Sequence, residues 1–331
     1  MNKPWTAATL LDLCRSFQPA SLLAAAADLE LFDTLGPDRL TADQIARRGQ
    51  WDRRGLTALL DALVALQLLH KHQHRYSVPA SVAQGLTRTG SDSVLAMVQH
   101  QANCLRRWAQ LARCVQTGRP ATRVTSLRGR QKDAAAFIGA MHDLNVRIAA
   151  PVVAALRSLP VTRLLDIGGA SGTWTLAVLR EHPAATAIIF DLPHVIPLAR
   201  RRLRQAGFLG RVQLVAGDFY TTALPRGCDL AWISAIVHQN SRQQNRQLFR
   251  QAHRALNPGG HLVIRDFLMA QSRTAPPAGA LFAVNMLVHT AHGGTFTFAE
   301  LRADLAAAGF GGIKVARRDT GMSALVVARR K

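Results

Sequence analysis

The sequence predicts an α/β fold in which a doubly wound, mostly parallel sheet follows an all-helical, winged-helix domain. From Val161 onward, β-branched runs alternate with helical patterns, which is typical of parallel sheets built from strand–helix–strand units. Before that point helical patterns dominate and a single hairpin interrupts them. A chain of 331 residues has room for two domains. We therefore expect a winged-helix domain over 1–100, a helical linker over 101–155 and the sheet domain over 156–331.

The first hundred residues show the order helix, helix, helix, hairpin. Alanine and leucine at helical spacing predict a helix from Leu10 to about Leu35. Thr41 and Gln44, three residues apart, predict a capping box at the start of a second helix, and Asp52 is placed to cap the third. Two short strands then surround a polar turn within 68–78. This order is typical of a winged helix.

The third helix and the hairpin indicate what this domain binds. A helix that reads DNA bases needs polar side chains, whereas this one is dominated by leucine and alanine, which favours a protein interface. The alternating residues His70, His72 and His74 would share one face of a strand, but no further ligand lies nearby. The cysteines also lack C-x-x-C spacing, so we expect no metal site and no disulfide framework. They are Cys14, Cys104, Cys114 and Cys228.

The segment before the sheet is predicted to be helical with one loop. Helical patterns cover Val94–Cys104, Leu105–Val115 and Ala134–Leu156, and Pro151 is expected to interrupt the last of these. Between them, Thr117–Lys132 is a basic stretch with glycine and proline, which indicates a loop.

Successive strands of the predicted sheet end in an acid. The strands are expected at 161–167, 186–190, 212–216, 229–234 and 261–265. Asp166 stands near the end of the first, Asp191 and Asp218 follow the next two, and His238 follows the fourth. Because ligands of such sheets bind beyond the carboxyl ends of the strands, we expect these side chains to gather there.

A glycine-rich turn links the first strand to a helix. Gly168, Gly169 and Gly172 let the backbone turn sharply and approach a ligand, and the following helix offers free N–H groups. Their spacing is not the G-x-G-x-x-G of dinucleotide sites. Asp166 before the glycines would face a cationic group. S-adenosylmethionine, which carries an ammonium and a sulfonium, is therefore the cofactor that this turn favours.

The chain is strongly basic, with a net charge of +21 and a pI near 11.5. Such a surface is able to follow phosphates, and Arg200, Arg201, Arg202 and Arg204 form a local cluster. However, only five of the 41 basic residues are lysine, and an arginine excess of this kind also arises from genomic composition. The charge alone therefore does not establish nucleic-acid binding. Without a signal peptide or an apolar run of about 18 residues, the protein is expected in the cytoplasm.

Taken together, these motifs make the chain resemble the class I S-adenosylmethionine-dependent methyltransferases. Over nearly its whole length it is similar to the O-methyltransferases typified by plant caffeic acid and animal hydroxyindole enzymes. The resemblance implies a Rossmann-like catalytic domain and a winged-helix dimerisation domain, and hence a homodimer. It is carried by 24–33, 59–66, 165–172, 190–193, 217–219, 237–241 and 256–260.

The resemblance implies a role for each residue of the cofactor site. Asp166 would lie near the ammonium, Asp191 would accept hydrogen bonds from the ribose, and Asp218 with Phe219 would hold the adenine. Gly168 and Gly172 would cradle the methionine moiety. The cofactor-binding set is Asp166, Gly168, Gly169, Gly172, Asp191, Leu192, Asp218, Phe219 and Ser234.

The resemblance also implies that His238 is the catalytic base and that Asp266 orients it. A histidine base makes a hydroxyl a better nucleophile, because a free phenol has a pKa of about 10. The methyl acceptor would be a small aromatic molecule. Its pocket would be lined by Met141, His142, Trp232, Met286, His289 and Thr290.

The sequence departs from the family pattern in four places. Ala170 replaces a frequent glycine, and Ser234 stands where plant members have lysine. Gln239-Asn240 replaces the usual Asp-Trp pair, and 295–297, just after Gly293-Gly294, lacks an expected second acid. These departures predict that His238 is oriented less tightly than in the family.

Three other functions stay open from the sequence. A nucleic-acid methyltransferase or binder would use the basic surface, although no Asn-Pro-Pro-Tyr-like segment and no separate RNA-binding module is found. A relative that binds the cofactor for other chemistry, or a winged-helix regulator that senses it, would keep the same fold.

Overall fold

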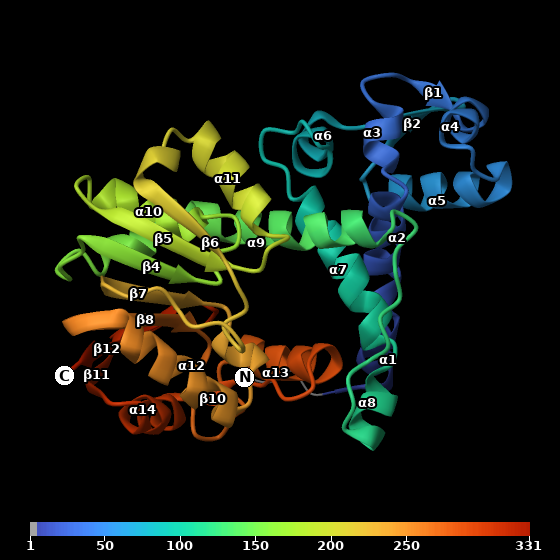
Figure 1. The fold of residues 1–331 in the computed structure, drawn as a ribbon. Helices are drawn as coiled ribbons and strands as arrows, with labels where there is room; N and C mark the ends of the chain where they lie inside the picture. The colour runs from blue at the N-terminus through green and yellow to red at the C-terminus, as the bar shows by residue number, and fades with distance from the viewer. Residues whose placement is uncertain (1–4) are drawn as a thin grey trace. The chain divides into compact units, whose positions relative to one another are not determined.

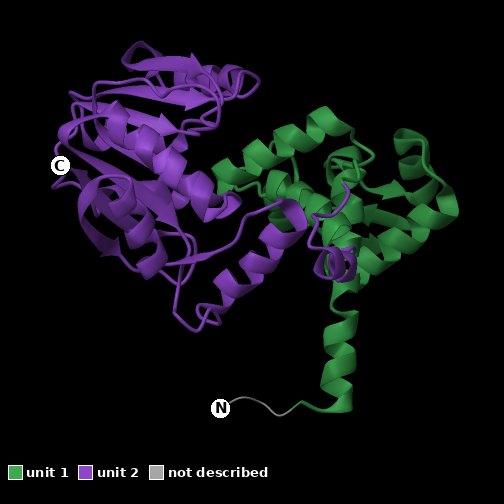
Figure 2. Cartoon of the chain, turned by 60° about the horizontal axis from the view of Figure 1, so that its bottom comes forward, with its two compact units in different colours: residues 1–109, 123–143 green, residues 110–122, 144–331 purple. Residues whose placement is uncertain are grey.

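The computed structural model describes residues 5–331, and the chain forms two compact units (Figure 2). The first unit comprises the described residues up to 109 together with 123–143, and the second comprises 110–122 and 144–331. The segment 101–155, which the sequence sets apart as a linker, is therefore divided between the two units.

The first unit is built from helices and a small three-stranded sheet in the order β1-β3-β2. A long helix, α9 (Arg130–Ala154), begins in this unit and ends in the second. The remaining elements are α1 (Ala7–Arg15), α2 (Phe17–Asp28), α3 (Leu31–Leu35), β1 (Leu40–Thr41), α4 (Ala42–Gly49), α5 (Arg53–Ala65), β2 (His70–His72), β3 (Arg75–Ser77), α6 (Ala80–Leu86) and α7 (Leu95–Trp108).

The predicted helix starts of this unit are confirmed. The Thr41 side chain accepts from the Gln44 backbone N–H, and the Asp52 carboxylate accepts from the Gly55 N–H at 2.7 Å. The single helix expected from Leu10 to Leu35 is wrong. A first break falls at Ser16, between α1 and α2, and a second at Glu30, whose left-handed conformation with φ 55° no helix accommodates. Three helices therefore replace the one that was expected.

The hairpin is confirmed as two short strands, but its histidines are not equivalent. His70 and His72 lie on β2, whereas His74 lies in the turn, and all three are exposed. Among the described residues, no group of three or more His, Cys, Asp or Glu side chains is arranged to hold a metal ion. Tyr76 on β3 packs into a core of leucines with Leu60 and Leu63.

The second unit holds the large sheet. Its helices are α8 (Leu111–Thr117), α10 (Thr173–Glu181), α11 (Ile196–Gln205), α12 (Arg242–Ala255), α13 (Pro277–His289) and α14 (Phe298–Ala307), with short 3₁₀ helices η1 (Leu209–Arg211) and η2 (Val237–Gln239). Its strands are β4 (Arg163–Ile167), β5 (Thr186–Asp191), β6 (Val212–Ala216), β7 (Cys228–Ser234), β8 (Leu256–Asp266), β9 (Leu268–Met269), β10 (Phe296–Thr297), β11 (Phe310–Arg317) and β12 (Ala324–Arg330).

Two predicted helix boundaries are wrong. The break expected at Leu105 falls after Trp108 instead, where α7 ends. Pro151 does not interrupt α9 but lies inside it. Because Pro151 stands in the last turn, its missing N–H removes one hydrogen bond close to the end of the helix, and the helix tolerates it.

The seven-stranded sheet has the order β11-β12-β8-β7-β4-β5-β6, which confirms the predicted doubly wound fold. The strands from β4 to β8 are parallel, and β12 runs antiparallel to both of its neighbours. One face is covered by α12 and α14, and the other by α10, α11 and the end of α9 (Figure 1). The strand order reverses at β4, between β5 and β7, and this is where such sheets bind ligands.

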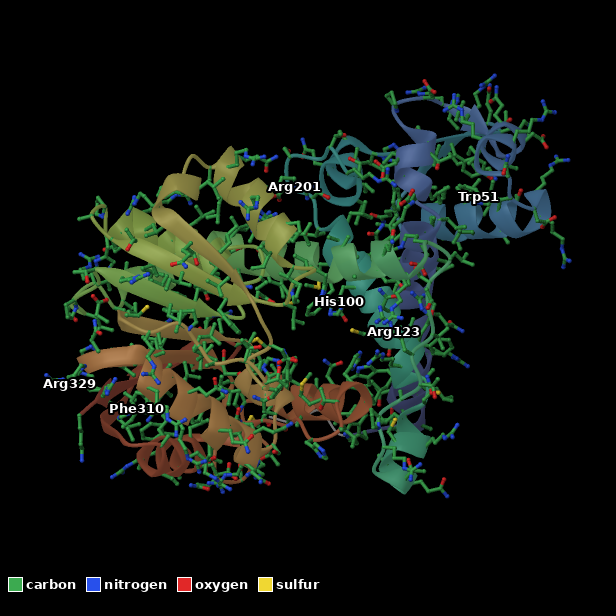
Figure 3. The ribbon with its side chains drawn as sticks, viewed as in Figure 1. Trp51, His100, Arg123, Arg201, Phe310 and Arg329 are labelled. Carbon is green, nitrogen blue, oxygen red and sulfur yellow. The ribbon has the colours of Figure 1, made fainter. Side chains whose placement is uncertain are left out.

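The arginine cluster predicted on the surface lies on α11, where Arg201 is labelled in Figure 3. Arg200, Arg201 and Arg204 are exposed, whereas Leu203 is buried against the sheet. Within residues 5–331, no helix combines the length and the apolar character needed to cross a membrane.

Candidate active site

The turn after β4 is shaped by its glycines. Gly168 and Gly172 have φ of +68° and +77°, which favours glycine. A Cβ added to Gly169 would stand 2.8 Å from Asp166 Cγ, so a larger residue would displace that carboxyl group. The backbone of this turn therefore passes close to Asp166 and leads directly into α10.

Asp166 is a buried carboxyl group at the carboxyl end of β4. It is 1% exposed, and the Thr175 hydroxyl donates to its Oδ2 at 2.6 Å. Burial, and secondarily the charge of Asp191, raises the pKa of Asp166 to about 7. A nearby cation would favour the charged form, so this group suits a positively charged ligand.

Asp191 ends β5, the strand next to β4. Its two carboxylate oxygens accept from the backbone N–H groups of Ala170 and Leu192, both at 2.7 Å. The pKa of Asp191 is raised by burial, against the effect of these two hydrogen bonds. Ala170, which replaces a frequent glycine of the family, thus uses its N–H to fix this acid.

The turn after β6 carries Asp218 and Phe219. The backbone N–H of Tyr220 donates to Asp218 Oδ1 at 2.9 Å, which makes a tight local turn. The Phe219 carbonyl accepts from Gln251 Nε2 at 2.7 Å, and its ring packs against the core next to the sheet. Both residues are partly accessible and lie at the same edge of the sheet as Asp166.

Ser234, at the end of β7, has a partner that the sequence did not indicate. Its hydroxyl accepts from Arg265 Nη1 at 3.1 Å. The Arg265 guanidinium is buried, lies 4.6 Å from the Trp174 ring centroid, and has a pKa lowered by burial to about 10. A buried cation therefore occupies this region of the sheet, although the family's lysine at 234 is missing.

His238 and Asp266 form a buried pair. Nδ1 of His238 lies 2.9 and 3.0 Å from the two carboxylate oxygens of Asp266. Asp266 also accepts from the backbone N–H groups of His238 and Phe267. Because the carboxylate accepts all three, Nδ1 carries the proton and Nε2 is left as the basic nitrogen.

The structure adds Phe282 to this pair. The Phe282 ring meets the His238 ring edge to face, with centroids 4.7 Å apart, and it also contacts Phe267. Sequence reasoning missed it because α13 is apolar over most of its length, so no single position stands out. Its spacing of four residues from Met286 was the signal that could have revealed a common helix face.

The residues expected to line an acceptor pocket are found in different environments. Trp232 is fully buried and stacks on Trp174 with centroids 5.2 Å apart, which is the environment of a core residue. On α13 and just beyond it, Met286 is buried, His289 Nδ1 lies 2.8 Å from the Asn285 carbonyl, and Thr290 donates to the Met286 carbonyl. Met141 and His142 lie on the part of α9 that belongs to the first unit.

These residues fit a cofactor with a cationic amino acid part and a nucleoside part. The crowded glycine turn admits a ligand against bare backbone, and Asp166 supplies a buried carboxyl group beside it. Asp191 and Asp218 add carboxylates at the ends of β5 and β6, which suits hydroxyl and amino donors. His238 then supplies a base held by Asp266.

Comparisons with known proteins found matching families and relatives. Residues 108–311 match a family described as an O-methyltransferase domain, and 11–87 match one described as an O-methyltransferase dimerisation domain. A 3-hydroxy-5-methyl-1-naphthoate 3-O-methyltransferase of Streptomyces sahachiroi is 30% identical over 93% of this chain and 90% of its own. The N,N-dimethyltransferase OxyT of Streptomyces rimosus is 29% identical over 92% and 90%.

A solved structure shares the fold. Human N-acetylserotonin methyltransferase, crystallised in complex with S-adenosylmethionine, superposes with a TM-score of 0.79 at 23% identity. The superposition covers 100% of this chain and 99% of the human one.

Proposed function

Because this chain belongs to the O-methyltransferase family, we propose that it transfers a methyl group from S-adenosylmethionine to a hydroxyl of a small aromatic molecule, with His238 as the general base. The observation that carries the proposal is the buried His238–Asp266 pair at the carboxyl edge of a sheet whose neighbouring strands end in Asp166 and Asp191.

The cofactor would be held by groups from three strand ends. Asp166 would pair with its ammonium, Asp191 with its ribose hydroxyls, and Asp218 and Phe219 with its adenine. The turn at Gly168, Gly169 and Gly172 would place backbone against it, with Leu192 and Ser234 at its sides. When bound, this cofactor supplies a methyl group already activated by the sulfonium.

His238 would then need only to take the proton of the acceptor hydroxyl. Asp266 holds Nδ1–H, keeps the ring in one tautomer and stabilises the positive charge that develops after proton transfer. The edge of Phe282 restricts rotation of the imidazole ring. Such a fixed base contributes typically about 10²- to 10⁴-fold to a rate.

The acceptor is proposed to be aromatic because apolar and aromatic side chains gather around His238. Phe282 lies beside its ring, Phe267 contacts Phe282, and Met286 follows one turn along α13. The Streptomyces sahachiroi relative acts, by its name, on a hydroxynaphthoate. We therefore place the acceptor of this chain among flat phenolic molecules, with His289 and Thr290 as further lining residues, whereas Trp232 is a core residue.

A homodimer through the first unit is part of the proposal. On α1 no residue is buried, and Leu10, Leu11 and Leu13 are each more than half exposed. Such an apolar helix needs a partner, and residues 11–87 match a dimerisation family. We place this dimerisation domain at 1–100 and the catalytic domain at 156–331. A separate part of the proposal is that the protein works in the cytoplasm. Its four cysteines are free, which is usual in that reducing compartment.

The test begins with calorimetric titration of S-adenosylmethionine and S-adenosylhomocysteine into the protein and into Asp191→Ala. Binding by the wild type that is strongly weakened in the variant supports the cofactor site, whereas no binding by folded wild type refutes it. Phenolic probes, 2-naphthol and 3-hydroxy-1-naphthoate, are then assayed for methylated product by mass spectrometry. A matching amine probe, 2-naphthylamine, separates O- from N-methylation.

His238→Ala tests the base. We expect kcat to fall by about 10²-fold or more while S-adenosylhomocysteine binds as before. His182→Ala, which removes a partly exposed histidine at the end of α10, is the matched control and should leave kcat unchanged. Equal turnover in both variants would exclude His238 as the base.

A further inference from the structure

A relay of side-chain hydrogen bonds runs from Tyr220 to the peptide that precedes His238. The Tyr220 hydroxyl donates to Asn240 Oδ1. Asn240 Nδ2 donates to Asn245 Oδ1 at 3.0 Å, and Asn245 Nδ2 donates to the Val237 carbonyl at 3.0 Å. Both asparagines are completely buried. The relay therefore links two loops through two amides that water does not reach, while its first member, Tyr220, is 50% exposed.

The direction of every bond in this relay is fixed by its last member. A backbone carbonyl only accepts, so Asn245 must turn its amide N–H₂ toward Val237 and its oxygen toward Asn240. Asn240 must in turn donate to Asn245 and present its own oxygen to Tyr220. The relay thus requires a protonated phenol at its far end. Burial, with the charge of Asp218, raises the pKa of Tyr220, so this phenol remains a donor.

At its far end, the relay starts in the turn proposed to bind adenine. The backbone N–H of Tyr220 donates to Asp218 Oδ1 at 2.9 Å, and the Tyr220 ring lies 4.6 Å from the Phe219 ring. Gln251 Nε2 holds the Phe219 carbonyl at 2.7 Å. A ligand against Asp218 and Phe219 would therefore act directly on the residue that begins the relay.

At its near end, the relay holds one of three anchors of the His238 turn. Asp266 holds the ring and the backbone N–H of His238, and the Gly294 N–H donates to the His238 carbonyl at 2.8 Å. Asn245 holds the carbonyl of Val237, the residue just before. Of these three anchors, Asn245 is linked to the 218–220 turn through Asn240 and Tyr220, which gives that turn a route to the histidine.

We propose that Tyr220 is a positioning residue whose hydroxyl couples occupancy of the Asp218–Phe219 turn to the orientation of His238. The proposal rests on the proposed function, because it takes that turn as the adenine site and His238 as the base. It gives a use to Asn240, which stands where the family usually has tryptophan. In this chain an amide joins two loops at that position.

The test compares Tyr220→Phe with wild type by NMR of histidine ring nitrogens, with the His238 signals assigned through His238→Ala. S-adenosylhomocysteine is the ligand, and calorimetry measures its Kd on the same samples. In the wild type we expect saturating ligand to shift the His238 signals. In Tyr220→Phe we expect Kd within about threefold of wild type and less than about a third of that shift.

The chain contains only one other tyrosine, Tyr76, which offers a matched control. Its hydroxyl donates to Asp61 at 2.7 Å within the first unit. Tyr76→Phe therefore also deletes one phenol hydrogen bond, but we expect the full ligand-induced shift at His238. Thermal unfolding of each variant confirms that it is folded. If a phenolic acceptor is found, kcat of Tyr220→Phe should fall by about tenfold, with KM for the cofactor unchanged.

The outcomes separate this inference from the proposed function. A full ligand-induced shift in Tyr220→Phe overturns the role of Tyr220, whatever its effect on stability. Equal loss of the shift in Tyr220→Phe and Tyr76→Phe also overturns it, because the effect would then be general. Failure of the wild type to bind S-adenosylhomocysteine refutes the proposed function itself.

Discussion

Replacing Asp166 by asparagine is expected to stabilise the ligand-free protein and to abolish tight cofactor binding at the same time. Burial raises the pKa of this carboxyl group from 3.8 to about 7. A raised pKa means that the folded state keeps the proton longer than the unfolded state does. The contribution of Asp166 to stability is therefore complete below about pH 4 and is lost as the pH rises to about 7.

The magnitude follows from the shift. About three pH units between the two pKa values correspond to about 4 kcal/mol at 1.36 kcal/mol per unit. The asparagine side chain would fill the same space and keep the same hydrogen bond without ionising, so Asp166→Asn avoids this loss above pH 7. In a protein of this size, we expect Tm at pH 8 to rise by about 5 °C or more and Tm at pH 4 to change little.

Cofactor binding gives an independent measure of the same group. An ammonium beside Asp166 would favour the carboxylate, so binding at pH 6 should release close to one proton and binding at pH 8 almost none. The Kd of S-adenosylhomocysteine should accordingly weaken by about tenfold per pH unit below pH 7. Calorimetry in phosphate and in imidazole, which both buffer near neutral pH and differ in ionisation enthalpy, counts the protons.

The control for this prediction is Glu181→Gln, an equal change at an exposed position of α10. It should alter neither the pH dependence of Tm nor proton release. Two results together would refute the account of Asp166 as a buried partner for a cation. In the first, Asp166→Asn raises Tm no more at pH 8 than at pH 4. In the second, wild type releases no proton when it binds the ligand at pH 6.

Three further variants test other parts of the site. Gly169→Ala puts a Cβ 2.8 Å from Asp166 Cγ. Calorimetry should therefore show that S-adenosylhomocysteine binds about tenfold or more weakly, and an unchanged Kd would mean that the turn relaxes freely. Asp266→Asn leaves His238 Nδ1 without its carboxylate. We expect kcat to fall by about 10²-fold while Kd for the cofactor stays constant. An unchanged kcat would remove Asp266 from the mechanism. Leu10→Glu with Leu13→Glu places charge on the exposed apolar face of α1, and sedimentation should find a monomer, while a persistent dimer would place the interface elsewhere.

The fold could be predicted from local patterns because most of its signals are local. Capping residues such as Thr41 and Ser241 act within three positions of themselves, and the parallel strands are continuous apolar runs. The helix break at Glu30 and the continuity of α9 through Pro151 were missed, because both depend on what the neighbouring segments allow rather than on residue type.

The candidate site was predictable only where one residue type carries the chemistry. Asp166, Asp191 and His238 stand at strand ends, and the topology of a parallel sheet brings strand ends together. Phe282 and Arg265 gave no such signal, since an apolar helix and an arginine-rich composition hide them. Their roles depend on long-range contacts, of which the four-residue spacing of Phe282 from Met286 is only a partial local signal.

The missing second acid illustrates how the structure resolves a departure that the sequence leaves open. The loss of that acid predicts a loosely held His238, yet both Asp266 oxygens lie within 3.0 Å of its Nδ1. The short segment after α13 contributes backbone instead, because the Gly294 N–H binds the His238 carbonyl at 2.8 Å. A Cβ on Gly293 would lie 2.5 Å from that same oxygen, so a side chain there would push the segment away. A close glycine contact thus replaces a carboxylate, and it holds the peptide of the histidine rather than its ring.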